Sequence, residues 1–289
     1  RFYYNYVCGI KEPDLNDEDK IDGRIFGNIF HRASQIVYEN LTDGNGWIEP
    51  ERIRQTLKSA ILIERAVDKA FNEEVFKSKA GNTPDYDGLQ LINREVVIIY
   101  LRRLLENDMK LGAFNIIGLE KTVNEEWQIN TPNHCFTTSL GGFIDRLDMV
   151  NTDLGMGIRV VDYKTGKYKL EKFADFNELF MTKSIARHSD YFIQAMLYSK
   201  IVRDSKHLNP KGLTVSPALL FIQQSIENSD DIILKLGGEK ITDIERYKAD
   251  FIGHLNTVIT EIFDSTKAFE PTEHRERCQQ CPYSAICNV

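Results

Sequence analysis

The sequence predicts an α/β fold in a single domain, residues 1–289, and three observations predict it. Apolar residues recur at helical spacing over residues 22–39 and again over 91–109. Two segments of alternating polar and apolar residues, 142–150 and 158–164, have the pattern of neighbouring strands. A chain of 289 residues is long enough to bury one large core. We therefore expect helices packed around a central sheet.

The composition excludes several classes of protein. With 42% hydrophobic and 27% charged residues, the chain is typical of a globular protein and is neither disordered nor fibrous. Its longest apolar run, residues 96–101, is much shorter than the roughly 20 residues that cross a bilayer. No membrane partner is therefore expected. The formal charge of −7 means that a nucleic acid would have to meet a local basic patch.

Local signals define the first helix. Asp22 is its expected N-cap, and Gly27, His31 and Gln35 share one of its faces.

Residues 40–110 are interpreted as a helical insertion, because polar loops alternate there with helical stretches such as 53–76. Gly112 then ends the helical pattern. Extended segments follow over residues 115–123 and 126–130, and they predict two strands.

The turn-rich segment 151–157 joins the two alternating segments into a predicted hairpin. A turn centred in this segment places Asp145 opposite Asp162. The same register places Asp148 opposite Arg159, a favourable pair of opposite charges across the strands. Since a slip of one residue would lose both patterns, each supports the other.

The C-terminal half adds two helices and a strand. The first helix covers residues 191–203, with Ser189 or Asp190 as its cap. An apolar strand is predicted over 217–223, and a long amphipathic helix over 241–264.

Three charged side chains converge in the predicted hairpin. Asp145 and Asp162 lie side by side, and Lys164 projects from the same face two residues further on. Adjacent carboxylates repel one another, and a hard divalent cation between them relieves the repulsion. The sequence therefore predicts a site for Mg²⁺ or Mn²⁺, where Lys164 assists an attacking water or stabilises developing charge. The alternative is a surface hairpin with a solvated ion pair.

These residues carry a resemblance to a known family. The segments Gly-Phe-Ile-Asp-Arg-Leu-Asp (142–148) and Val-Val-Asp-Tyr-Lys-Thr-Gly (160–166), with Gln194 and Tyr198, resemble the PD-(D/E)xK nuclease superfamily. The match is closest to its RecB and AddB exonuclease branch, and it covers nearly the whole chain. It implies a restriction-endonuclease-like core, in which helices flank a mixed central sheet, with an N-terminal helical insertion.

The resemblance also implies a role for each matched residue. Lys164 completes the catalytic site, and Glu120, on the first core strand, orients a water molecule. The implied metal ligands are His31, Asp145, Asp162 and the backbone carbonyl of Tyr163. The residues implied to contact DNA are Tyr191, Gln194, Tyr198 and Lys167.

Ordinary structural roles are the alternatives for several of these residues. His31 could be a helix histidine whose hydrogen bonds are satisfied within the fold, and Glu120 a surface residue. Gln194 and Tyr198 could lie on the helix surface or pack in the core. From residue 164 to 203 the sequence has eight basic and four acidic residues. This excess predicts a basic stripe for the DNA backbone, the alternative being a solvated loop and helix face.

Three of the five cysteines, Cys278, Cys281 and Cys287, lie in a C-terminal segment, residues 270–289. Their spacing suits metal ligands in a reducing compartment, so a cytoplasmic protein is expected. By the resemblance they hold a [4Fe-4S] cluster, with a fourth cysteine ahead of Arg1 or, as a substitute, Cys8. Four thiolates also suit zinc, and free thiols are the structural alternative.

Together these features lead to a functional expectation. The resemblance implies a divalent-metal-dependent DNA exonuclease of recombination and repair, which hydrolyses phosphodiester bonds by metal-activated water. DNA and a helicase domain or subunit are its implied partners. The alternative from another class is a nuclease-fold module that binds DNA or a helicase without cutting. A standalone nuclease acting on single strands is a third interpretation.

Overall fold

The computed structural model describes residues 2–12, 21–77, 85–166, 171–223, 229–272 and 275–287. It divides into two compact units, which are described separately. The larger unit contains Ile21–Gln128 and Thr137–Leu255. The smaller unit contains Arg1–Lys20, Ile129–Phe136 and Asn256–Val289.

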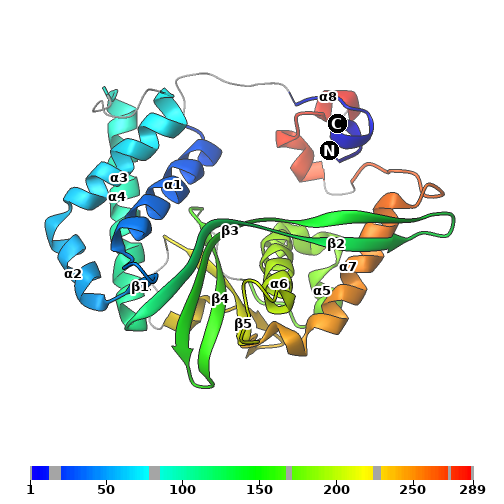
Figure 1. The fold of residues 1–289 in the computed structure, drawn as a ribbon. Helices are drawn as coiled ribbons and strands as arrows, with labels where there is room; N and C mark the ends of the chain where they lie inside the picture. Colours follow the sequence, from blue (N-terminus) through cyan, green and yellow to red (C-terminus); the bar gives the residue numbers. More distant parts are fainter. Residues whose placement is uncertain are drawn as a thin grey trace. The chain divides into compact units, whose positions relative to one another are not determined.

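A five-stranded sheet forms the centre of the larger unit (Figure 1). Its strand order follows the sequence, β1-β2-β3-β4-β5. Strands β3 and β4 are antiparallel whereas β4 and β5 are parallel, so the sheet is mixed, as expected. The strands are β1 (Trp47–Ile48), β2 (Phe114–Asn130), β3 (Cys135–Thr152), β4 (Gly155–Lys164) and β5 (Thr214–Phe221), and a separate pair consists of β6 (Lys235–Leu236) and β7 (Glu239–Lys240).

Helices cover both faces of this sheet (Figure 1). The α-helices are α1 (Gly23–Leu41), α2 (Pro50–Ser59), α3 (Ile61–Phe71), α4 (Gly88–Asp108), α5 (Phe176–Leu179), α6 (Ser189–Asp204), α7 (Lys248–Phe263) and α8 (Ser284–Cys287). Short 3-10 or π turns are η1 (Tyr3–Val7), η2 (Asn72–Phe76), η3 (Met109–Leu111), η4 (Thr182–Arg187), η5 (Ser229–Ile232), η6 (Ile244–Arg246) and η7 (Arg275–Gln280). In the part of the chain that is described, no helix has the length and apolar character needed to span a membrane.

The predicted hairpin register is confirmed. Leu147 pairs with Val160 and Asp148 pairs with Arg159, as the positions of the opposite charges indicated. The paired residues begin at Arg146 opposite Val161, so the predicted pair of Asp145 and Asp162 lies one position beyond them and stays a prediction.

Helix α1 begins where the sequence predicted. The Asp22 carboxylate accepts a hydrogen bond of 2.7 Å from the Ile25 amide and caps the helix. Fully buried residues of α1, such as Phe30 and Val37, belong to one core with α3, α4 and the β4 residue Val161. This packing fixes α1 on one face of the sheet.

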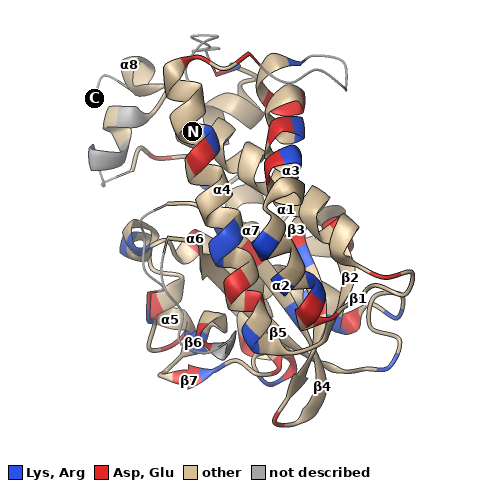
Figure 2. Ribbon diagram, turned by 90° about the vertical axis from the view of Figure 1, so that its left-hand side faces the viewer, with Lys and Arg blue, Asp and Glu red and all other residues tan. Residues whose placement is uncertain are grey.

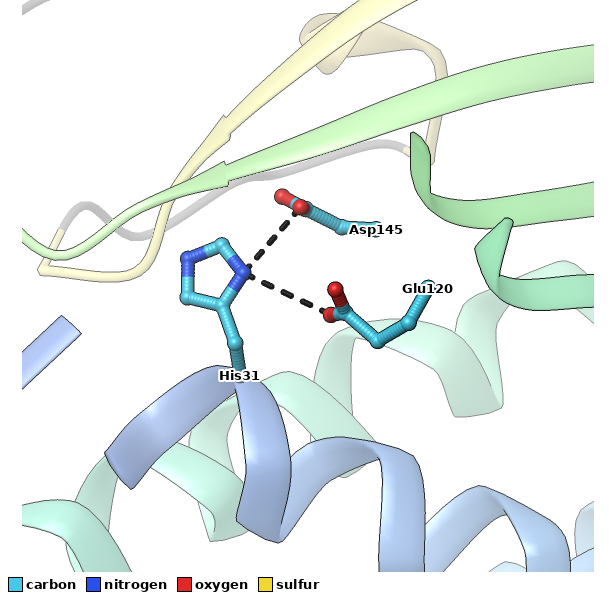
Figure 3. A group of neighbouring side chains, drawn as sticks. All are labelled: His31, Glu120 and Asp145. Atoms are coloured by element: carbon cyan, nitrogen blue, oxygen red, sulfur yellow. Dashed lines mark ion pairs between the residues drawn. The ribbon is translucent and has the colours of Figure 1, made fainter. Parts of the chain in front are cut away.

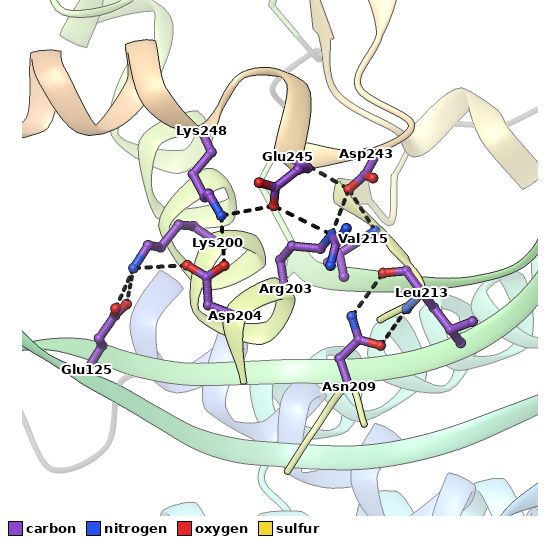
Figure 4. Close-up of polar contacts among 10 residues, drawn as sticks. All are labelled: Glu125, Lys200, Arg203, Asp204, Asn209, Leu213, Val215, Asp243, Glu245 and Lys248. Atoms are coloured by element: carbon purple, nitrogen blue, oxygen red, sulfur yellow. Dashed lines mark hydrogen bonds and ion pairs between the residues drawn. The ribbon is translucent and has the colours of Figure 1, made fainter. Parts of the chain in front are cut away.

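Helix α6 packs on β4 and β5 and is tied to its neighbours by ion pairs (Figure 4). The buried Lys200 ammonium pairs with Glu125 of β2 and lies 3.3 Å from Asp204. Lys248 of α7 in turn lies 2.9 Å from both Asp204 and Glu245. These contacts fix the helix that carries Tyr191, Gln194 and Tyr198.

Several predicted element boundaries were wrong. The predicted helical stretch 53–76 is interrupted at Ala60, where a φ of 54° ends α2 and begins α3. The two strands predicted over 115–123 and 126–130 are one continuous strand, β2. Exposed and buried residues keep alternating through Asn124, so the strand is not interrupted there. Helix α7 starts at Lys248, since the residues before it form β7 and η6.

The predicted cap of α6 was also wrong. His188, with a φ of 56°, occupies the N-cap position, and Ser189 is already the first helical residue. The short strands β1, β6 and β7 were not predicted, because two residues are too few for a visible alternation.

Candidate active site

Three side chains from three different elements meet at one point (Figure 3). His31 projects from the middle of α1, and its Nδ1 lies 3.1 Å from Asp145 Oδ1 of β3 and 3.7 Å from Glu120 Oε1 of β2. One nitrogen and two oxygen ligand atoms lie within 4.8 Å of one another. Within the described residues, no other group of three or more His, Cys, Asp or Glu side chains is as close.

The second oxygen of Asp145 is held by the neighbouring strand. The Tyr163 amide of β4 donates a hydrogen bond of 2.6 Å to Asp145 Oδ2. Asp145 is only 8% exposed. Asp145 is therefore fixed from one side by the backbone and presents its other oxygen to His31.

Asp162 and Lys164 form an ion pair beside this group. Lys164 Nζ lies 2.6 Å from Asp162 Oδ2, and it also lies 4.2 Å from the centre of the Tyr191 ring. Burial, followed by the negative charge of Asp145, raises the pKa of Asp162 to about 6, although Lys164 opposes the shift. The two aspartates thus repel one another, as the sequence predicted for adjacent carboxylates.

The protonation of His31 reflects the same excess of negative charge. Burial alone would lower its pKa, but the hydrogen bonds and charges of Asp145 and then Glu120 raise it to about 10. A divalent cation would supply the missing positive charge in place of the proton. Imidazole nitrogen and carboxylate oxygens are suitable donors for Mn²⁺, and carboxylates for Mg²⁺. The residues at this site therefore fit a divalent metal ion.

Glu120 reaches the site through an unusual backbone conformation. Its φ of 45° lies in the left-handed region, although it is neither a glycine nor in a turn. Such a residue costs on the order of 1–3 kcal/mol, and this strain is often found at functional sites. The strained residue is the one that directs its carboxylate toward His31.

The structure brings some predicted site residues together and separates others. His31, Glu120 and Asp145 form the close group, and Lys164 and Asp162 lie next to it. Asp162 is not a member of the close group. The carboxylate that lies close to both His31 and Asp145 is that of Glu120.

The predicted DNA-contacting residues occupy different environments. Tyr198 is buried, and a Cβ at Gly142 would lie 2.0 Å from its hydroxyl, so Gly142 makes room for this side chain. Gln194 donates a hydrogen bond of 3.1 Å to that hydroxyl. Half-buried Tyr191 contacts Lys164. Lys167 lies outside the described residues, and a DNA contact by any of the four stays a prediction.

A buried network behind the site was missed by the sequence analysis. Arg146, which follows Asp145, is fully buried and lies 2.5 Å from Asp108 at the end of α4 and 3.0 Å from Asp148. Its guanidinium also donates to the Tyr38 hydroxyl of α1 and lies over the Tyr163 ring. This arginine therefore links α1, α4, β3 and β4, the elements that position His31 and both aspartates.

The expected basic stripe is largely neutralised by ion pairs. Of the basic residues in 164–203 that are described, Lys164, Arg187, Lys200 and Arg203 each pair with a carboxylate. Figure 2 shows acidic and basic residues interspersed along the helices, as on α3. The local excess of basic residues in sequence was therefore a poor guide to the charge of the folded surface.

The cysteine segment lies in the smaller unit, against the N-terminal residues. The Tyr283 hydroxyl donates a hydrogen bond of 2.7 Å to the Ile10 carbonyl, and the Tyr283 and Tyr4 rings lie 5.5 Å apart. Cys287 Sγ lies 3.7 Å from the Tyr4 hydroxyl. Within the described residues, however, Cys278 and Cys281 do not form a close ligand group with Cys287 or Cys8. That criterion describes ligands of a single ion, so the binding of a cluster by these cysteines stays a prediction.

A model of the PD-(D/E)XK nuclease superfamily matches residues 1–288. The chain belongs to this superfamily. The assignment of Asp162, Lys164 and Asp145 to the PD-(D/E)XK motif stays a prediction.

Curated relatives of this PD-(D/E)XK protein share one name, that of a component of an ATP-dependent helicase/deoxyribonuclease. The one from Clostridium acetobutylicum is 23% identical over 252 residues, which are 84% of this chain and 19% of that protein. The proteins of the same name from Listeria welshimeri and Listeria monocytogenes are each 28% identical, over 52% and 50% of this chain. The chain spans less than a fifth of the length of these relatives.

Proposed function

We propose that the chain is a divalent-metal-dependent deoxyribonuclease of the AddB type, an exonuclease that acts in DNA recombination and repair. The observation that carries this proposal is the close group of His31, Glu120 and Asp145 beside the Lys164–Asp162 ion pair. Membership of a nuclease superfamily and the deoxyribonuclease name of the relatives support it.

Each residue has a distinct task in this proposal. His31, Asp145, Glu120 and Asp162 hold the metal ion, with the Tyr163 carbonyl as an additional ligand. When bound, Mg²⁺ or Mn²⁺ polarises the phosphoryl oxygen and makes water more acidic. Lys164 places its ammonium group where negative charge develops on the phosphate, and Asp162 and the Tyr191 ring hold that group in position.

The partners follow from the same proposal. DNA is the substrate, Tyr191 and Gln194 border its path, and a helicase domain or subunit supplies single strands. That helicase is inferred from the name of the relatives.

We also propose Cys278, Cys281 and Cys287 as ligands of a structural iron–sulfur cluster, a proposal that rests on the resemblance of their spacing to that of AddB-like exonucleases. Iron and acid-labile sulfide analysis of protein purified without oxygen would test it. Protein free of both iron and sulfide would contradict it.

The experiment that tests the nuclease is a time course with end-labelled linear DNA, single- and double-stranded, in Mg²⁺, Mn²⁺ or chelator. We expect products that shorten progressively from an end, and no cleavage with chelator. Internal cuts would contradict the exonuclease type. DNA binding without cleavage, together with the absence of tight Mn²⁺ binding in calorimetry, would favour the non-catalytic binding module instead.

A further inference from the structure

Two cavities of similar size have His31 in their lining. The first, of about 380 Å³, is bordered by Lys164, Thr165 and Tyr191. The second, of about 370 Å³, lies on the side of Glu120, and we call it the α1 cavity. His31 borders both. The proposed metal site therefore borders two cavities, each large enough for a small polar group.

The α1 cavity is lined by polar side chains from one face of a single helix. Arg24, Asn28 and Gln35 recur with His31 at steps of four, three and four residues, which places all four on one face of α1. Because α1 is anchored in the core through Phe30 and Val37, the backbone positions of these residues are fixed relative to His31.

The cations of this cavity differ in their partners. Arg32 is already engaged, since it lies 2.5 Å from Glu73 and donates a hydrogen bond of 2.7 Å to Gln35. Arg24 is exposed, and it has no carboxylate partner among the residues that the structure describes. Glu74 also lines the cavity, and its negative charge repels an anion there. Among the described residues of this cavity, Arg24 is thus the arginine that is free to bind an external anion.

We propose that the α1 cavity is a phosphate-binding subsite for the substrate strand, in which Arg24 and Asn28 hold the phosphate next to the one that is cleaved. The inference rests on the proposed function. A single strand would then extend from the Lys164 cavity, past His31, into the α1 cavity. Arg24 supplies a charge-assisted contact and the Asn28 amide a neutral donor, and both are independent of base sequence.

This placement predicts how binding depends on substrate size and on salt. A strand of several nucleotides reaches the α1 cavity, whereas bis(p-nitrophenyl) phosphate, which has a single phosphodiester, does not. One phosphate contact in a single strand contributes about 0.7 to the slope of log affinity against log salt concentration. Loss of Arg24 should therefore make that slope shallower by about 0.7.

The test compares Arg24→Gln and Asn28→Ala with the wild-type chain on a single-stranded oligonucleotide and on bis(p-nitrophenyl) phosphate, in Mn²⁺. For Arg24→Gln we expect a KM for the oligonucleotide about tenfold higher, an unchanged kcat, and an unchanged rate with the small diester. Asn28→Ala should show a smaller change of the same kind. The matched control is Arg54→Gln, at an exposed arginine of α2. This change should leave KM and kcat unaltered for both substrates.

Each other outcome has a definite meaning. An unchanged KM for the oligonucleotide in Arg24→Gln, or an equal loss with both substrates, would overturn the subsite while leaving the nuclease in place. If the wild-type chain cleaves neither substrate, the proposed function fails, and fluorescence anisotropy with a labelled oligonucleotide in Ca²⁺ still tests the subsite. Weaker binding by Arg24→Gln, with the shallower salt slope, supports it, and equal binding overturns it.

Discussion

The imidazole of His31 lies 3.1 Å from the carboxylate of Asp145, although the two residues come from a helix and a strand that are far apart in the sequence. This contact leads to the first prediction. Replacing His31 by Ala removes one of the proposed metal ligands, so Mn²⁺ affinity measured by calorimetry should fall by more than about 100-fold. His134→Ala, an exposed histidine in the β2–β3 connection, is the matched control and should bind Mn²⁺ normally.

The second prediction concerns the ion pair of β4. Lys164→Met should lower the rate of DNA cleavage by roughly 100- to 1,000-fold, because the ammonium group beside Asp162 is lost. Mn²⁺ affinity should change much less, since lysine is not a ligand. Lys58→Met, on the exposed end of α2, is the control. An equally large loss of Mn²⁺ affinity would show that Lys164 acts on the metal site rather than on the phosphate.

The strained backbone of Glu120 yields a third prediction, about stability. Glu120→Gly and Glu120→Ala remove the same carboxylate and should weaken Mn²⁺ binding equally. Glycine tolerates a φ of 45° and alanine does not, so the glycine variant should be more stable to urea by about 1 kcal/mol. This reverses the usual order of the two residues in a strand. The usual order would mean that the conformation is not strained.

Gly142 and Tyr198 form the basis of a fourth prediction. Gly142→Ala places a methyl group against the Tyr198 hydroxyl and should lower the free energy of unfolding by about 1–3 kcal/mol. Tyr198→Phe removes that hydroxyl, so the double variant should recover part of the loss. Gly88→Ala, where a Cβ meets no atom within 4 Å, should have little effect. Strict additivity of the two changes would show that they do not touch.

The fifth prediction concerns the buried arginine. Arg146→Met leaves Asp108 without its buried cation and should destabilise the fold by about 3–5 kcal/mol in urea denaturation. Pairing it with Asp108→Asn should reduce the loss, because no unpaired charge then stays buried. Breaking the exposed Arg54–Glu51 pair by Arg54→Met should cost less than about 1 kcal/mol. A similar cost for both arginines would contradict a structural role for Arg146.

Sequence patterns were sufficient where the determining interactions are local. The register of β3 and β4 followed from the opposition of Asp148 and Arg159, which are close in the chain. The Asp22 cap followed from its position before the apolar repeat. In both cases the partners lie within one element or one hairpin, so their spacing alone defines the geometry.

Patterns failed where the partners come from distant elements. Nothing in the sequence near Arg146 indicates that Asp108 of α4 and Tyr38 of α1 surround it. Likewise, the sequence predicts that Lys200 and Arg203 are available for DNA. In the structure they pair with carboxylates of β2 and of the residues before α7. Such pairings depend on the packing of whole elements, which residue spacing does not encode.

Asp145 and Arg146 are successive residues of β3, so the position of Asp145 beside His31 depends on the same strand register that buries Arg146. Successive strand residues point to opposite sides, so a β3 strand displaced by one position would put a carboxylate among Tyr38, Phe114 and Tyr163 and expel the arginine. That arrangement has no cation to compensate the buried negative charge, and it would unfold. Such misfolded molecules are thereby removed by their own instability, and those that survive hold Asp145 beside His31.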